Sequence, residues 1–278
     1  MPKVAIQGVP GAFHHVAAKR YFSGETVDIV SAKTFDKLLE RVADRDQADC
    51  GLMAIENTIA GSLLNNYQIL NASGLRVGGE VYLRIEQNLM VLPGVKIEEL
   101  REVYSHPVAI HQCRKFFKKY PKIKLIDAED TALSAKRVRK RGKRSVGAIA
   151  PGLSAEMYGL EIIAAGIETY KRNHTRFLVL ERRDGTVQTT GNKVSLCFTL
   201  GHRVGSLAMI LNAFALHNAN LTKIQSVPLL DSHFEYFFFV DFLLEDDGDL
   251  EGIINVLRKH TRELRVLGRY VAGERESD

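Results

Sequence analysis

Cysteine and long apolar runs are both scarce in this sequence of 278 residues. The three cysteines, Cys50, Cys113 and Cys197, lie far apart, with no metal-ligand spacing and no even pairing, so we expect reduced thiols. The longest apolar stretches are far too short to cross a bilayer, which excludes a transmembrane helix. The N-terminus becomes polar after a brief apolar run, which does not fit a signal peptide. We therefore expect a cytoplasmic protein with no membrane partner.

Acidic residues are fewer than basic ones. The chain holds 38 Lys and Arg against 33 Asp and Glu, which gives a net charge of +5 and a pI near 9.0. Most of the excess lies between residues 114 and 144, where thirteen basic side chains accompany three acidic ones. Aromatic residues are few in this stretch and it contains no nucleic-acid motif, so no nucleic-acid partner is expected. Solvated helix faces account for the charge, with attraction of a small anion as the second interpretation.

The hydrophobic pattern divides the chain into two parts. Up to residue 183, short apolar strands alternate with amphipathic helices, which predicts an α/β domain. Residues 183–192 are polar and contain glycine, as is typical of a linker, and the order beyond them is βαββαβ, that of a ferredoxin-like domain. We predict domains at 1–183 and 193–278, the first built from two lobes, with two crossings between them, around a cleft. The open sheet edge of the second domain favours pairing with another copy.

Two local patterns give sharper expectations. Residues 82–92 alternate and are predicted to form one strand, and residues 230–232 are predicted to form a turn between two C-terminal strands. The apolar run 178–180 is bounded by charge, which predicts a buried strand with residues 173–176 just before it. Asn, His, Thr and Arg side chains there offer donors, acceptors and a fixed cation, which suits an anionic ligand. The alternative is a solvated turn that leads into the strand.

Polar residues also follow two earlier strands. Residues 51–55 form a predicted strand that runs directly into Glu56-Asn57-Thr58 and then Gly61-Ser62. The C-terminal ends of buried parallel strands are where α/β folds hold ligands, whereas the alternative is that Thr58 or Ser62 caps the next helix. The turn from Gly8 to Gly11 joins a strand to a helix and presents backbone N–H groups suited to an anion, although an ordinary βα turn has the same pattern.

Four spaced motifs give the chain a resemblance to a known family. The motifs are Glu56-Asn57-Thr58 with Gly61-Ser62, Ser105-His106-Pro107 with Gln112-Cys113, Met157-Tyr158-Gly159-Leu160, and Asn173-His174-Thr175-Arg176-Phe177. Together they resemble prephenate dehydratase over nearly the whole chain. The resemblance implies two catalytic lobes similar to periplasmic binding proteins, a C-terminal ACT domain that binds L-phenylalanine, and a homodimer or homotetramer.

The resemblance also implies residue roles, with prephenate as the substrate. Thr175 would donate a proton or hydrogen bond to the leaving hydroxyl, while Asn57, Ser105 and Gln112 would hold the substrate. The other implied substrate-binding residues are Glu56, Thr58, Gly61, Ser62, Arg176, Phe177 and Gly11. The implied effector-binding residues are Gly205, Leu207, Asn220, Leu221 and Ser226. The family reaction needs neither a metal nor a cofactor, and we expect none.

Some questions stay open at the level of sequence. Arg176 either clamps a substrate carboxylate or pairs with Glu56 as part of the scaffold. Gln225 and Val227 stand where the family usually has glutamate and arginine, which puts the effector site in doubt. Arogenate dehydratase differs only in an amino group on the substrate and is an alternative function. A non-catalytic protein that binds a small anion and carries an amino-acid sensor is another.

Overall fold

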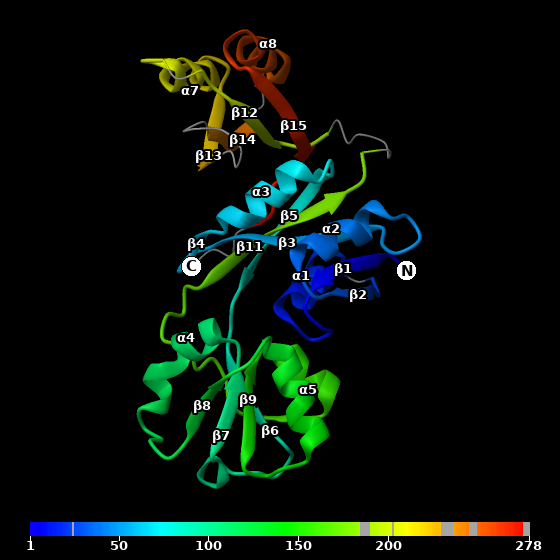
Figure 1. The fold of residues 1–278 in the computed structure, drawn as a ribbon, viewed down its shortest axis with the longest axis vertical. Coiled ribbons are helices and arrows are strands. Elements are labelled where there is room, and N and C mark those ends of the chain that lie inside the picture. Colours follow the sequence, from blue (N-terminus) through cyan, green and yellow to red (C-terminus); the bar gives the residue numbers. More distant parts are fainter. Residues whose placement is uncertain (24, 184–189, 202, 229–235, 245–248, 275–278) are drawn as a thin grey trace. The chain divides into compact units, whose positions relative to one another are not determined.

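The structure is a computed structural model that describes residues 1–23, 25–183, 190–201, 203–228, 236–244 and 249–274. It divides into two compact units (Figure 1). Unit 1 consists of residues 1–61 and 82–177, and unit 2 of residues 62–81 and 178–278. The predicted turn at 230–232 and most of the predicted linker lie outside the described residues. The predicted domain boundaries, 1–183 and 193–278, stay a prediction.

The first lobe of unit 1 is an alternating α/β segment. Its elements are β1 (Lys3–Gln7), α1 (Phe13–Tyr21), β2 (Asp28–Ala32), α2 (Phe35–Ala43) and β3 (Cys50–Asn57). β1 pairs in parallel with both β2 and β3, and its apolar centre is fully buried, as expected for a parallel strand covered on both faces. The whole sheet has the order β2-β1-β3-β11-β5, and the short β4 (Gly61–Ser62) pairs with β3. The end of β3 therefore lies inside a sheet, beside β11.

The second lobe of unit 1 is a five-stranded sheet with helices on both faces (Figure 1). Its elements are β6 (Asn88–Val91), η1 (Ile97–Glu99), β7 (Glu102–Ser105), α4 (Pro107–Phe117), β8 (Lys124–Asp127), α5 (Thr131–Arg141), β9 (Val146–Ala150), α6 (Gly152–Tyr158) and β10 (Glu161–Ala164). Alternation along β9 separates the two faces, because Ile149 joins the core with α4 whereas Ala148 and Ala150 join the core with α5. Asp130 caps α5 through the Leu133 N–H, and Gly142 ends it with a left-handed φ of 63°.

Two crossings join the lobes, as predicted, but one strand assignment was wrong. Residues 82–92 are not one strand: β5 (Arg76–Arg84) and β6 belong to different sheets, and residues 85–87 connect them. The alternation ends at Ile85, and the polar run at residues 86–88 interrupts it at the break. The second crossing runs from β10 to β11 (His174–Glu181), and the Ile85 N–H donates to the Asn173 carbonyl at 2.7 Å.

The polar cluster at 173–176 also differs from its predicted placement. Most of it lies within β11 rather than ahead of the strand, because the strand begins at His174, and Thr175 and Arg176 are buried. The strand β8 was not predicted at all. The remaining strands and helices of the α/β prediction are confirmed, with ends that differ by a few residues.

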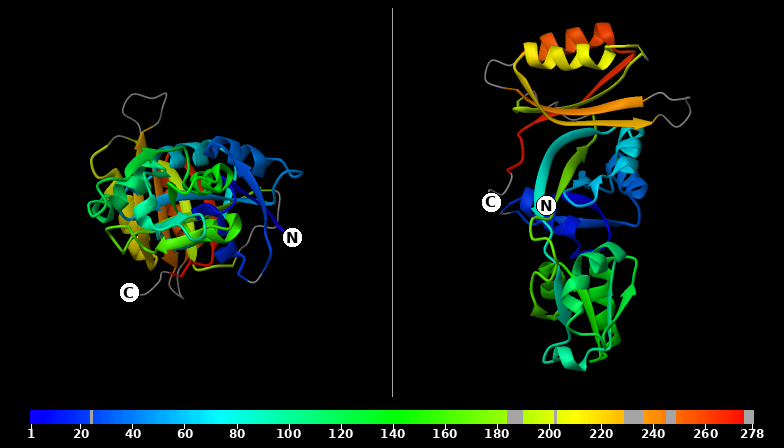
Figure 2. Two further views of the ribbon diagram at one scale, coloured as in Figure 1. Left: turned by 90° about the horizontal axis from the view of Figure 1, so that it is seen from below. Right: turned by 90° about the vertical axis from the view of Figure 1, so that its left-hand side faces the viewer.

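Unit 2 contains the predicted βαββαβ order. Its elements are α3 (Leu64–Ala72), β12 (Lys193–Thr199), α7 (Ser206–Leu216), β13 (Ala219–Pro228), β14 (Tyr236–Leu244), α8 (Leu250–His260) and β15 (Glu263–Tyr270). The antiparallel sheet has the order β13-β14-β12-β15, and α7 and α8 lie together on one face (Figure 2). Val240 and Phe242 of β14 pack into the core with those helices, whereas Phe239 points the other way and contacts Tyr67 of α3.

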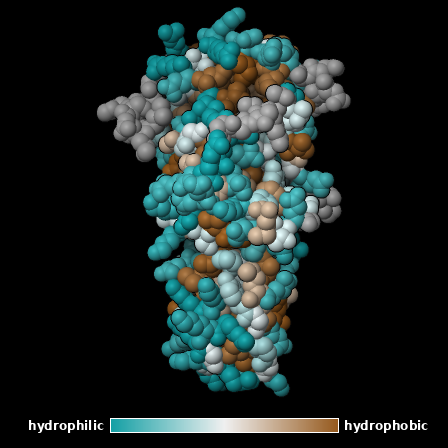
Figure 3. Space-filling view, turned by 90° about the vertical axis from the view of Figure 1, so that its right-hand side faces the viewer, coloured by the Kyte–Doolittle hydropathy of each residue, from teal (hydrophilic) through white to brown (hydrophobic). Residues whose placement is uncertain are grey.

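The surface agrees with the composition. On the face drawn in Figure 3, hydrophilic side chains predominate and apolar ones form small groups among them. No helix in the described part of the chain is long and apolar enough to span a membrane.

Candidate functional site

Asn57, the last residue of β3, is the half-buried centre of a hydrogen-bond cluster in unit 1. Its Oδ1 accepts the backbone N–H groups of Ile59 and Ala60, both at 2.9 Å. Its Nδ2 donates to Asn173 Oδ1 at 2.7 Å and to Thr175 Oγ1 at 2.9 Å. Backbone N–H groups only donate, so they fix which end of the Asn57 amide carries the nitrogen. The structure thus brings together Asn57 and Thr175, which are 118 residues apart in the sequence.

Thr175 is 8% exposed and accepts a hydrogen bond from Asn57. Because the oxygen accepts, the hydroxyl hydrogen remains available, and no described residue receives a hydrogen bond from it. The side chain is therefore a donor without an acceptor in the part of the chain that the structure describes. This arrangement suits the predicted role of Thr175 toward a leaving hydroxyl.

The hydroxyl of Thr58, next to Asn57, bonds to the backbone rather than to another side chain. Its hydroxyl accepts the His174 N–H at 3.0 Å and donates to the Arg172 carbonyl at 3.1 Å, which ties the end of β3 to the start of β11. Gly61 has a φ of 77° and is exposed. Ser62 does not cap α3, and nor does Thr58, because the capping residue is Leu63 and it makes no side-chain hydrogen bond. The Ser62 hydroxyl instead accepts the Lys223 ammonium at 2.6 Å, within unit 2.

Strand alternation separates Arg176 from Thr175. Thr175 and Phe177 share one face of β11, and Arg176 points to the other, where its guanidinium lies 6.0 Å from the Tyr82 ring centre. Glu56 likewise points away from the face that Asn57 uses, which favours the scaffold interpretation of Arg176 over a carboxylate clamp. Phe177 is 1% exposed and belongs to the core.

His14 of α1 contacts Phe177 edge-on, with ring centres 5.0 Å apart. Its Nε2 is buried, and no described residue supplies a hydrogen-bond partner for it. Burial lowers the pKa of His14 to about 4, so the imidazole is neutral near pH 7. The sequence pattern placed no chemistry on His14, and only its packing beside the Thr175 strand marks it.

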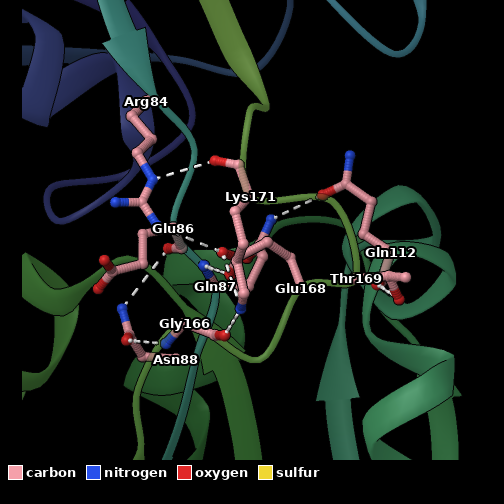
Figure 4. Close-up of polar contacts among 9 residues, drawn as sticks. All are labelled: Arg84, Glu86, Gln87, Asn88, Gln112, Gly166, Glu168, Thr169 and Lys171. Carbon is pink, nitrogen blue, oxygen red and sulfur yellow. Dashed lines mark hydrogen bonds and ion pairs between the residues drawn. The ribbon is translucent and has the colours of Figure 1, made fainter. Parts of the chain in front are cut away.

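Gln112 of α4 is held by both crossings (Figure 4). Its carbonyl accepts the N–H and the hydroxyl of Thr169, both at 2.9 Å, and its Oε1 accepts the Gln87 amide at 3.2 Å. Gln87 is 3% exposed and is fixed in turn by its N–H, which donates to Glu168 at 2.9 Å. The Gln112 nitrogen points away from this network in Figure 4, and a substrate contact from it stays a prediction. Sequence reasoning missed Gln87, which no motif includes.

Ser105 is also buried, at the end of β7. It is 0% exposed, and its hydroxyl donates to the Ile149 carbonyl at 2.7 Å. That hydrogen bond ties β7 to β9, so the hydroxyl hydrogen is already engaged inside the protein. A substrate contact from Ser105 stays a prediction, limited to its oxygen as an acceptor.

The turn from Gly8 to Gly11 contacts the second lobe. The Gly11 N–H donates to His15 Nδ1 at 3.1 Å, so it is not free for an anion as the sequence analysis expected. The Gly11 carbonyl accepts the Ser154 hydroxyl at 2.9 Å, and the Pro10 carbonyl accepts the Tyr158 hydroxyl. Tyr158 belongs to one of the four motifs, and its position indicates that this motif holds the lobes together.

The predicted effector residues lie in unit 2. Gly205 precedes α7 with a φ of 81°, which glycine adopts without strain, and Leu207 follows in the first turn of that helix. Asn220, Leu221 and Ser226 lie on β13, an edge strand of the sheet. Val227, where the family usually has arginine, is 0% exposed.

Other features carry less chemistry. A hollow of about 460 Å³ in the second lobe is lined by residues that include Tyr104, Arg137 and Arg141, but its cations pair with Glu129 or stack on Tyr104. The three cysteines are buried and none of them forms a disulfide, and burial raises the pKa of Cys113 to about 12. No group of three His, Cys, Asp or Glu side chains suited to a metal ion occurs among the residues described.

Comparison with known proteins agrees with this geometry. The family model of prephenate dehydratase matches residues 4–185. Arogenate dehydratase/prephenate dehydratase 1 of Arabidopsis thaliana is 34% identical over 284 residues, covering 96% of this chain and 71% of that protein. The prephenate dehydratase of Arthrobacter aurescens in complex with L-Phe superposes with a TM-score of 0.85 at 26% identity, covering 97% of this chain and 89% of that one. GqqA, described as a novel type of quorum quenching acylase, superposes with a TM-score of 0.87 at 29% identity, covering 97% and 98%.

The fold is that of a two-lobed α/β protein joined to a βαββαβ segment, and its candidate site holds neutral amides and a hydroxyl. The chain belongs to the prephenate dehydratase family. It is a dehydratase of that family. The expected cytoplasmic location stays a prediction, since the Arabidopsis relative is named as chloroplastic.

Proposed function

We propose that the chain converts prephenate to phenylpyruvate, with release of water and CO2. The C–C bond to the ring carboxylate breaks, and its electron pair enters the ring as the C–O bond at the opposite carbon breaks. The departing hydroxide accepts a proton from the Thr175 hydroxyl, and solvent then returns a proton to that side chain. The ring becomes aromatic. Oxidation and reduction balance within the substrate, so the protein supplies orientation and hydrogen bonds.

The hydrogen bond from Asn57 to Thr175 carries this proposal. It leaves the threonine as a donor, which is what a departing hydroxide needs. An acyl-transfer reaction, as named for GqqA, would need a base that takes the proton from a nucleophile. Asn57 presents an amide nitrogen to Thr175, and that nitrogen cannot act as such a base.

Prephenate rather than arogenate is the substrate we propose. The two differ where prephenate has a keto oxygen and arogenate an ammonium. The open polar end of Gln112 is a nitrogen, a donor that suits a keto oxygen rather than an ammonium.

Parallel assays of the purified chain test the proposal. Phenylpyruvate absorbance would follow prephenate turnover, and amino-acid analysis would follow phenylalanine release from arogenate. We expect kcat/KM to be higher with prephenate. Turnover of arogenate alone would correct the substrate, and turnover of neither would leave a small-anion-binding protein.

We further propose that L-phenylalanine binds unit 2 and inhibits the enzyme. The support is the similarity to a prephenate dehydratase in complex with L-Phe, together with the retained Gly205 and Leu207 at the start of α7. Because Val227 and Gln225 remove a cation and its partner, we expect inhibition that is less cooperative than in the family. Calorimetry with an inhibition curve tests this: no heat at millimolar L-phenylalanine would mean that the site is lost.

A further inference from the structure

Asn173 is a buried residue beside Thr175 to which the motifs assign no role. Its side chain is 0% exposed, and its carbonyl accepts the Ile85 N–H. Its Oδ1 accepts Asn57 Nδ2 at 2.7 Å, but its own Nδ2 has no partner among the residues described. A buried donor without an acceptor costs about 1–3 kcal/mol. This unpartnered nitrogen lies beside Thr175, where we expect the substrate to bind.

The open end of the Asn173 amide is a nitrogen and not an oxygen. Two backbone N–H groups fix Oδ1 of Asn57, which directs its Nδ2 toward Asn173 and Thr175. An acceptor must face that nitrogen, so Asn173 presents its oxygen there. Its Nδ2 then points elsewhere, as a donor in a place that water does not reach.

We propose that Asn173 and Thr175 form a donor pair that holds the oxygen leaving the substrate as hydroxide. Both side chains are anchored on the same atom, Asn57 Nδ2, and both have a donor to spare. A threonine hydroxyl alone is a weak acid. A second donor in surroundings without water adds to the stabilisation of the developing negative charge.

This inference rests on the proposed function and predicts which kinetic constant depends on Asn173. The ground-state hydroxyl is neutral, and negative charge develops on its oxygen only as the C–O bond breaks. The two hydrogen bonds therefore strengthen in the transition state, so their loss should lower kcat with little change in KM.

The test is Asn173→Asp in the full chain. The substitution keeps the size and the oxygen that faces Asn57, and it replaces the open nitrogen by a carboxylate oxygen. At pH 8 we expect kcat to fall by about 10²–10³-fold, with KM within about threefold of wild type. Burial should raise the pKa of the introduced carboxyl, since the side chain that donates to it, the Asn57 amide, is uncharged. Once protonated it can donate, so kcat relative to wild type should recover as the pH falls toward 5.

Asn88→Asp is the matched control. Asn88 is 2% exposed at the other crossing, and its amide is engaged with the Gly166 N–H at 3.0 Å and the Glu86 carbonyl at 3.5 Å. The control should keep the wild-type kcat and pH profile. Asn173→Ala gives a second measurement if the aspartate variant does not fold, and its loss of kcat should not depend on pH.

Several results would overturn the inference. They are a wild-type kcat in both Asn173 variants, a loss confined to KM, or the same pH profile in Asn173→Asp and Asn88→Asp. In each case wild-type turnover would still support the proposed function. A wild-type enzyme that converts neither prephenate nor arogenate would overturn both.

Discussion

Two polar clusters, one in each unit, differ in chemistry. In unit 1 the side chains of Asn57, Asn173 and Thr175 are neutral, and Asn173 Nδ2 has no partner among the residues described. In unit 2 the buried Lys193 and Glu80 are charged and paired: Lys193 donates to both oxygens of Glu80, at 2.8 and 2.9 Å.

The difference follows from the cost of burial. An unpaired buried charge costs several kcal/mol, so the fold must close it, whereas one open end of an amide costs about 1–3 kcal/mol. A site can therefore keep neutral groups open for a substrate. We expect the open amide of Asn173 to mark the place where substrate binds, and the paired charges of Lys193 and Glu80 to belong to the scaffold.

The largest effect should be a loss of turnover when the site around Thr175 is changed. Thr175→Ala should lower kcat by about 10²–10⁴-fold with little change in KM, because a donor used mainly in the transition state is lost. Stability should change little, since Asn57 keeps Asn173 as an acceptor. Steady-state kinetics with prephenate would measure the effect, and Thr175→Ser is the control that restores a hydroxyl. A well-folded alanine variant with near-normal turnover would show that the site is misplaced.

The same comparison shows what the sequence could and could not predict. A continuous apolar run located β3, which is buried along most of its length, and alternation and helical periodicity located the βαββαβ order, because burial leaves a local pattern. The motifs singled out Asn57 and Thr175. No local pattern records that Asn57 meets Asn173 across 116 residues, nor that Gln87 holds Gln112, because hydrogen bonds between distant segments leave no periodicity.

The next largest effect should be a loss of stability when the buried pair of Lys193 and Glu80 in unit 2 is broken. Lys193→Met removes one partner of a pair in which Glu80 is 4% exposed, and it leaves a buried carboxylate without its cation. We expect a loss of about 3–5 kcal/mol in the free energy of unfolding, measured by urea denaturation. The double variant Lys193→Met, Glu80→Leu should recover much of that loss. Equal stability of the single variant and the wild type would contradict the distinction between closed charges and open amides.

A smaller effect concerns the buried imidazole of His14 in unit 1, which becomes charged only at low pH. The pKa of His14 is lowered from 6.5 to about 4 by burial, so the unfolded chain binds a proton between these values and the folded chain does not. Its contribution to stability is complete above about pH 6.5 and is lost as the pH falls toward 4, by at most about 3 kcal/mol.

The His14→Gln variant isolates this contribution. Asp130, whose pKa burial raises, acts in the opposite direction because the folded protein then holds the extra proton. Asp130 is present in both proteins, so its contribution to the pH dependence of stability cancels in the difference between wild type and variant. Urea unfolding at pH 8, 6 and 5 should show a variant that loses less stability on acidification, and parallel curves would refute the buried neutral imidazole.

The smallest effect should come from a hydrogen bond between two side chains of unit 2. Lys223 of β13, the strand that carries three of the predicted effector residues, donates to Ser62 at 2.6 Å. If L-phenylalanine binds beside β13, the hydrogen bond between Lys223 and Ser62 lies on the strand that carries the effector residues. Lys223→Met should therefore leave L-phenylalanine binding by calorimetry within about twofold, yet weaken inhibition by about fivefold, near the lower end of typical coupling. Ser62→Ala should also weaken inhibition, and the double variant should match Lys223→Met, because that variant already lacks the hydrogen bond to Ser62. Lys223→Arg, which keeps the charge and a donor, should retain most of the inhibition. Additive effects of the two single variants would show that Lys223 and Ser62 act separately, and unchanged inhibition in all of them would place the coupling elsewhere in unit 2.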